Sequence, residues 1–170
     1  PALRTNEAAA STYKLLPEVM EQVDAEYGPL DWRLPQAHAI YWAHRGKPFA
    51  RGFDRVSIDR MIFQSLGDAF FRGELFLGRD GQAFVPSPNL ALLPRVEAAF
   101  DAALAANPDQ AGMRDAHRNF LGQAAVLLFT YNRYAQAQAV FEKLHAAYPS
   151  LETEQGLEAF VHTAFTSQLE

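Results

Sequence analysis

Apolar residues recur at the spacing of an α-helix along almost the whole chain, and this spacing restricts the fold to helices packed on helices. The longest stripe starts at Asp54 and consists of Ile58, Ile62, Ser65, Leu66, Ala69, Phe70 and Gly73. Residues 113–131 are apolar on most sides, which predicts a central buried helix. Further helices are predicted over residues 134–147 and 153–168. The chain is therefore expected to be all-α.

Prolines mark where the other helices are expected to begin. Pro35 and Pro94 stand where a first helical turn would start, since proline lacks the N–H that a first turn leaves unused. Pro17 fits either the first turn of a helix or a kink in a longer helix that begins near Thr5.

One segment departs from helical spacing. The stretch "ELFLGRDGQAFVPSPN" places apolar triplets on both sides of residues 78–81. Asp-Gly between two such runs favours a hairpin turn, and the prolines that follow exclude a central strand. We expect a short hairpin or an ordered loop near residues 74–86.

Composition narrows the functional classes. The 170 residues are 49% hydrophobic and fit a single soluble domain over residues 1–170. A net charge of −5 argues against nucleic-acid binding, and the lack of cysteine excludes thiolate catalysis and cysteine-ligated zinc. No apolar run reaches the length of a membrane span. The chain begins at Pro1 instead of Met, so excision from a larger protein and loss of a targeting or anchor segment stay open, as does its compartment.

The segment "YNRYAQAQAVFEKLHAAYP" resembles the second half of a tetratricopeptide (TPR) repeat. The matching positions are Ala125 in the preceding helix and, within the segment, Tyr134, Ala137, Phe141 and Pro149. The match covers about residues 118–149 and departs at Leu121, where the family has a large aromatic residue. Two weaker echoes precede it, around Phe100 and Pro108 and around Ala39 and Trp42. The resemblance implies an irregular TPR-like solenoid of antiparallel helix pairs, with one good repeat and two degraded ones.

The same resemblance implies a non-catalytic module that holds a peptide or a partner helix in a groove. The groove would be lined by Asn119, Gly122, Gln123, Val126 and Thr130. Family members that clamp a terminal carboxylate use Lys and Asn at such positions. Gly122 and Val126 stand at two of them, which argues against a chaperone-tail clamp.

The stretch "DWRLPQAHAIYWAHRG", residues 31–46, concentrates aromatic and basic side chains. His38 and His44 fall about 120° apart around a helix, so they are not expected to share a metal. Trp42 shares a face with Ala39, Ala43 and Gly46, which predicts a packing surface that shields Trp42 from solvent. We expect no cofactor and no metal.

The basic residues cluster at Arg45, Lys47, Arg51 and Arg55, with His44 and Arg60 beside them. Such a cluster is usually a solvated or salt-bridged surface. As a functional site it would bind an anionic partner: an acidic protein segment, a phosphate or a membrane surface.

Two alternatives to the groove-binding module remain. One is a structural domain whose aromatic faces are buried in a larger complex, which could be anchored to a membrane. The other is an enzyme with its site inside a helical bundle, for which Glu142 and His145 have suitable spacing but lack a second such pair. Exposed apolar area would favour the first, and acids and histidines converging in a cavity would favour the second.

Overall fold

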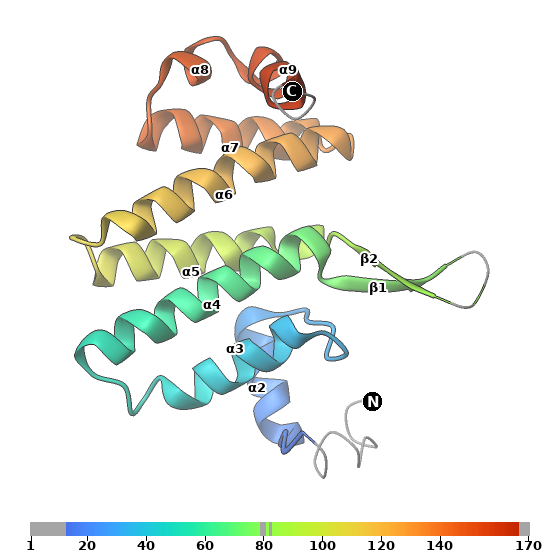
Figure 1. Cartoon of the computed structure of the whole chain (residues 1–170), viewed down its shortest axis with the longest axis vertical. Helices are drawn as coiled ribbons and strands as arrows, with labels where there is room; N and C mark the ends of the chain where they lie inside the picture. The colour runs from blue at the N-terminus through green and yellow to red at the C-terminus, as the bar shows by residue number, and fades with distance from the viewer. Residues whose placement is uncertain (1–12, 79–80, 82, 167–170) are drawn as a thin grey trace. The chain divides into compact units, whose positions relative to one another are not determined.

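The computed structural model describes residues 13–78, 81 and 83–166, and helices dominate it (Figure 1). The helices are Pro17–Tyr27 (α2), Pro35–Gly46 (α3), Gly52–Arg72 (α4), Leu93–Ala106 (α5), Ala111–Thr130 (α6), Tyr134–Ala147 (α7), Leu151–Glu154 (α8) and Leu157–Thr166 (α9). A short 3-10 turn, Leu90–Leu92 (η2), leads into α5. The all-α prediction is confirmed. The chain forms two compact units, Pro1–Asn107 and Pro108–Glu170.

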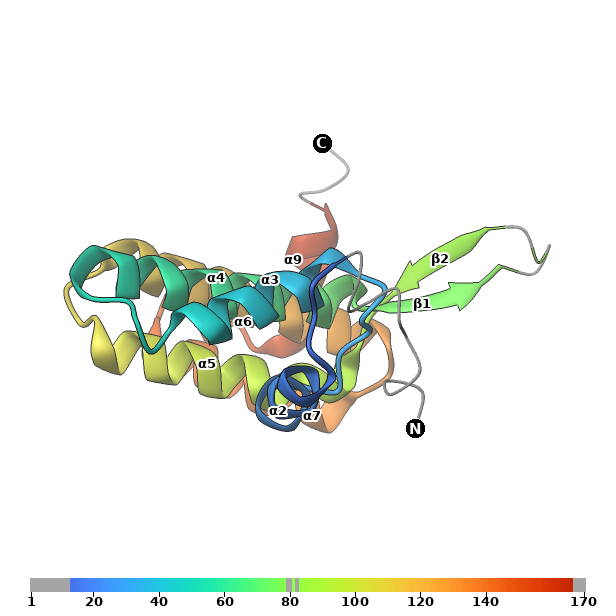
Figure 2. The same cartoon turned by 90° about the horizontal axis from the view of Figure 1, so that it is seen from below.

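The first unit is built around α4, which packs against α3 and α5 (Figures 1 and 2). Phe63 of α4 is buried and stacks on Phe100 of α5, with 4.4 Å between the ring centroids. On α3, Ile40 and Tyr41 are fully buried. The Tyr41 hydroxyl accepts a hydrogen bond of 2.9 Å from the backbone N–H of Leu16, which ties the segment before α2 to α3.

The predicted hairpin is confirmed. Strands Glu74–Leu77 (β1) and Phe84–Ser87 (β2) pair in antiparallel register, with Leu77 opposite Phe84. The backbone N–H of Gly78 donates to the carbonyl of Ala83 at 2.7 Å, which continues the ladder toward the turn. Within the turn, Arg79 and Asp80 lie outside the described residues.

The second unit is built on the α6–α7 pair, with α9 packed against both helices. Ala125 of α6 and Ala137 of α7 are fully buried, so small side chains line the interior of this unit. The Phe141 ring of α7 lies 5.4 Å from the Phe160 ring of α9.

Two helix boundaries differ from the sequence-based expectation. The single helix predicted over 153–168 is wrong, because Gly156 adopts a φ of +87° and separates α8 from α9. At the other end, α2 begins at Pro17 and residues 13–16 are not helical, so Pro17 starts a helix and does not kink a longer one. Thr5 lies outside the described residues.

Candidate interaction surfaces

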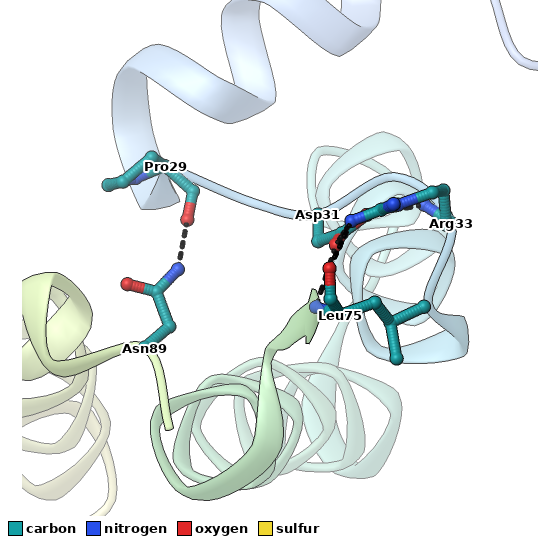
Figure 3. Close-up of polar contacts among 5 residues, drawn as sticks. All are labelled: Pro29, Asp31, Arg33, Leu75 and Asn89. Carbon is teal, nitrogen blue, oxygen red and sulfur yellow. Dashed lines mark hydrogen bonds and ion pairs between the residues drawn. The ribbon is translucent and has the colours of Figure 1, made fainter. Parts of the chain in front are cut away.

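The hairpin is fixed to the first unit by a polar cluster at the start of β1 (Figure 3). The Asp31 carboxylate accepts hydrogen bonds from the backbone N–H of Leu75 at 3.2 Å and from Arg33 Nε at 2.7 Å. The Arg33 guanidinium in turn donates to the carbonyl oxygen of Leu75 at 3.0 Å. Both backbone groups of Leu75 are therefore held by the segment between α2 and α3.

The other end of the hairpin is held at Asn89, which is buried. Its side-chain amide donates to the carbonyl of Pro29 at 2.9 Å (Figure 3). Its backbone N–H donates to the carbonyl of Phe70 at 3.0 Å. Between α4 and β1 stands Gly73, where a Cβ atom would lie 2.1 Å from the carbonyl oxygen of Ala69. The connection between α4 and β1 thus requires glycine at position 73. Contacts with the first unit therefore fix the hairpin at both of its ends.

Apolar side chains cover the distal half of the hairpin on both faces. Phe76 pairs with Val85 on one face, and Leu77 pairs with Phe84 on the other. All four are between 52% and 60% exposed. Both views show the strands extending beyond the helices of the first unit (Figures 1 and 2). We call residues 74–87 the hairpin arm. An isolated two-stranded hairpin is marginal in water, and its edges offer unpaired backbone groups, so this surface is suited to burial against a partner.

Lowering the pH is expected to loosen the base of the hairpin arm. Hydrogen bonding from Arg33 is the main cause that lowers the pKa of Asp31 below its ordinary value. A lowered pKa in the folded state contributes stability above the unfolded pKa of about 4, and this is lost as the pH falls through the folded value. NMR should show the Leu75 amide resonance shifting in this acid range in the native chain but not in Asp31→Asn. A Leu75 resonance that does not respond to acid would contradict the assignment.

The four residues of the predicted basic cluster do not share one set of contacts. Lys47 Nζ and Arg55 Nε each lie 3.5 Å from a carboxylate oxygen of Asp59, which is buried. Arg51 belongs to the same loop and donates to the carbonyls of Pro48 and Ala50. Salt bridges and loop contacts thus occupy three of the four predicted residues.

The fourth residue of the predicted cluster, Arg45, lies over two rings of α3. Its guanidinium carbon is 5.4 Å from the Trp42 ring and 6.0 Å from the Tyr41 ring. His44, beside it, pairs instead with Glu26, at 3.2 Å between Nδ1 and Oε2.

Removing the Asp59 carboxylate should destabilise the first unit. Asp59→Asn leaves Lys47 and Arg55 without their shared anion, and we expect a loss of about 2 kcal/mol. This is below the 3–5 kcal/mol typical of a fully buried pair, because both cations are partly exposed. Asp54→Asn on the same helix is the matched control, since Asp54 is exposed, and should change stability by less than about 0.5 kcal/mol. Urea denaturation measures both, and equal midpoints would contradict a role for Asp59 in holding the loop.

Two phenylalanines next to this cluster, which the sequence did not single out, are the most exposed large apolar residues that the structure describes. Phe49 and Phe53 are 84% and 82% exposed, more than any other large apolar side chain in the described part of the chain. They alternate with the cationic residues in "KPFARGFDR", residues 47–55. That alternation was visible in the sequence and is the signal that could have found them.

The predicted groove-lining residues lie along one face of α6. Asn119, Gln123 and Thr130 are exposed, whereas Gly122 and Val126 are half-buried. A Cβ atom at Gly122 would lie 3.5 Å from Cζ of Phe160, so α9 covers part of this face. The Thr130 hydroxyl donates to the carbonyl of Val126 and is engaged with its own helix.

The prediction that Trp42 is shielded is wrong, because its side chain is 46% exposed. Helix α3 buries Ala37, Ile40, Tyr41 and Ala43. Successive residues are 100° apart around a helix, so the adjacent Trp42 turns away from the face that Tyr41 shares with the core.

The histidines of α3 each have a separate partner. His38 contacts the carbonyl of Trp32 at 2.9 Å, and His44 contacts Glu26. In the described ranges no group of three or more His, Asp or Glu residues is placed to hold a metal ion. A depression of about 340 Å³ lies on α4, lined by Ser57, Arg60, Met61, Gln64, Ser65 and Asp68. It contains hydroxyls but no histidine that could activate them.

None of the helices in the part of the chain that the structure describes is long and apolar enough to cross a bilayer. Comparisons with protein-family models, with curated proteins and with solved structures give no match for this chain.

Proposed function

We propose that this chain is a non-catalytic protein–protein interaction module that joins a larger assembly through the hairpin arm. The observation that carries the proposal is the exposed apolar surface on both faces of the arm, at Phe76, Leu77, Phe84 and Val85. Exposed apolar area is the property that favours an assembly domain over an enzyme with an internal site.

The way the arm is attached supports the same function. Its base is fixed by Asp31, Arg33 and Asn89, while its distal half projects from the helices. A partner that encloses the distal half would desolvate two phenylalanine rings, a residue type that is enriched in the buried cores of protein interfaces. The partner is a protein with a cleft that admits both faces of the arm.

The experiment introduces charge at the arm and follows the size of the native complex. In cells that naturally make the protein, Leu77→Lys combined with Phe84→Lys should release the full-length chain from its assembly, seen as a lower mass on size exclusion. Ala102→Lys combined with Ala105→Lys adds the same charge to exposed positions on α5 and should leave the mass unchanged. The proposal fails if the arm variant and the control elute together, provided that both melt like the native chain.

A second candidate follows from the resemblance to TPR repeats. We propose that the α6 face with Asn119, Gln123, Val126 and Thr130 receives a peptide. Its support is the burial of Ala125 and Ala137 inside the α6–α7 pair, which is where the repeat pattern needs small residues. Gln123→Arg should then reduce partner capture while the arm variant does not. The reverse result favours the hairpin arm alone.

A further inference from the structure

The connection between α3 and α4 together with the first turn of α4, residues 47–55, combines projecting aromatic rings with an excess of positive charge. We call it the α3–α4 tip. Phe49 and Phe53 are its two exposed rings. Figures 1 and 2 show the tip at one end of the α3–α4 pair and the hairpin arm at the other. The tip is therefore a surface separate from the arm.

The backbone of the tip is held in a defined shape. Ala50, which lies between Phe49 and Phe53 in the sequence, is buried. It therefore anchors the loop while the two rings project. The Arg51 guanidinium donates to the carbonyls of Pro48 and Ala50 at 3.0 and 2.8 Å, and Arg55 donates to the carbonyl of Lys47 at 3.2 Å. Phe49 and Phe53 thus project from a backbone that hydrogen bonds hold in place, and their exposure is not due to a disordered segment.

The charge around the tip is opposite to that of the whole chain. Residues 45–60 carry five cationic side chains and two carboxylates, a local net charge of +3 in a chain of net charge −5. Asp59 is engaged by Lys47 and Arg55. Among the described residues, the partners of Arg51 are neutral carbonyl groups, which do not compensate its charge. Charges beyond about 8 Å are largely screened at physiological salt, so a surface touching the tip meets the local positive charge.

We propose that the α3–α4 tip binds the surface of an anionic lipid bilayer. Phe49 and Phe53 enter the boundary between headgroups and acyl chains, and Lys47, Arg51 and Arg55 lie at the level of the phosphates. An anionic bilayer fits the tip because exposed rings and local positive charge occur there together. A deformable apolar layer receives projecting rings without a complementary pocket.

The first test is sedimentation of the full chain with lipid vesicles. Binding should be at least about tenfold stronger to phosphatidylcholine mixed with phosphatidylserine than to phosphatidylcholine alone, and should weaken as salt is added. Phe49→Ser combined with Phe53→Ser should reduce binding by about tenfold or more, because two apolar rings no longer leave water. Phe76→Ser combined with Phe84→Ser removes two exposed rings from the hairpin arm and should leave vesicle binding unchanged.

A second measurement locates the contact. The chain has no cysteine, so Phe53→Cys gives a unique position for an environment-sensitive dye. Its emission should shift to shorter wavelength when anionic vesicles are added, whereas the same dye at Ala105→Cys, an exposed position on α5, should not respond.

Three results would overturn the proposal: no binding of the native chain to anionic vesicles, equal loss in the tip and arm variants, or equal dye shifts at both positions. Binding to polyglutamate without binding to vesicles would also overturn it, and would identify the tip as a site for an acidic protein segment. None of these outcomes depends on whether the hairpin arm binds a protein.

Discussion

Replacing Ala137 with arginine is expected to destabilise the second unit by about 3 kcal/mol or more. Ala137 is fully buried in α7, on the side that packs within the unit. An arginine there must either force the helices apart or bury an unpaired charge, and each carries a cost of this size. Chemical denaturation followed by circular dichroism should show early loss of the helical signal of this unit.

Ala139→Arg is the matched control because it makes the same change two residues along the same helix. Ala139 is exposed, and arginine is almost as good a helix former as alanine, so the expected change is below about 0.5 kcal/mol. Equal denaturation midpoints for the two variants would show that the interior face of α7 is misassigned.

Replacing Phe63 with alanine should be similarly damaging to the first unit, with an expected loss of about 3–5 kcal/mol. The ring is buried and stacks on Phe100, so its removal takes away the stack that joins α4 to α5 and leaves a cavity. The change in the free energy of unfolding can be measured by urea denaturation of the full chain.

Phe53→Ala on the same helix tests whether position, and not residue type, causes this loss. Phe53 is 82% exposed, so its removal should change stability by less than about 0.5 kcal/mol. A large loss in Phe53→Ala would mean that the α3–α4 tip is packed inside the protein, and would also remove the basis for membrane binding.

The helical elements were largely predictable from the sequence, because apolar spacing indicates the helices and prolines indicate where they begin. Helix α7 has the predicted bounds, Tyr134 to Ala147, and α3 begins at Pro35 as expected. The hairpin was predictable from Asp-Gly between two apolar runs. The break at Gly156 was not, because the positive φ that separates α8 from α9 is a backbone conformation that the apolar residues after it do not reveal.

The interaction surfaces were harder to predict because burial depends on tertiary packing. Tyr41 and Trp42 are adjacent aromatics on one helix, and periodicity alone did not show that Tyr41 is buried while Trp42 is exposed. The hairpin was expected from the sequence, but the exposure of its apolar residues on both faces was not. The apolar pattern of a short hairpin is the same whether its side chains pack on the core of the chain or are exposed to solvent.

Site-specific photo-crosslinking from the hairpin arm tests the proposed function most directly. A photoreactive amino acid is placed at Leu77 of the full-length protein in its native cells, with the same residue at Ala105 as the control position. The proposed function predicts a discrete crosslinked protein at Leu77 that is absent at Ala105 and lost when Phe84→Lys is added. The same pattern at both positions, or a product that persists with Phe84→Lys, would contradict docking through the hairpin arm.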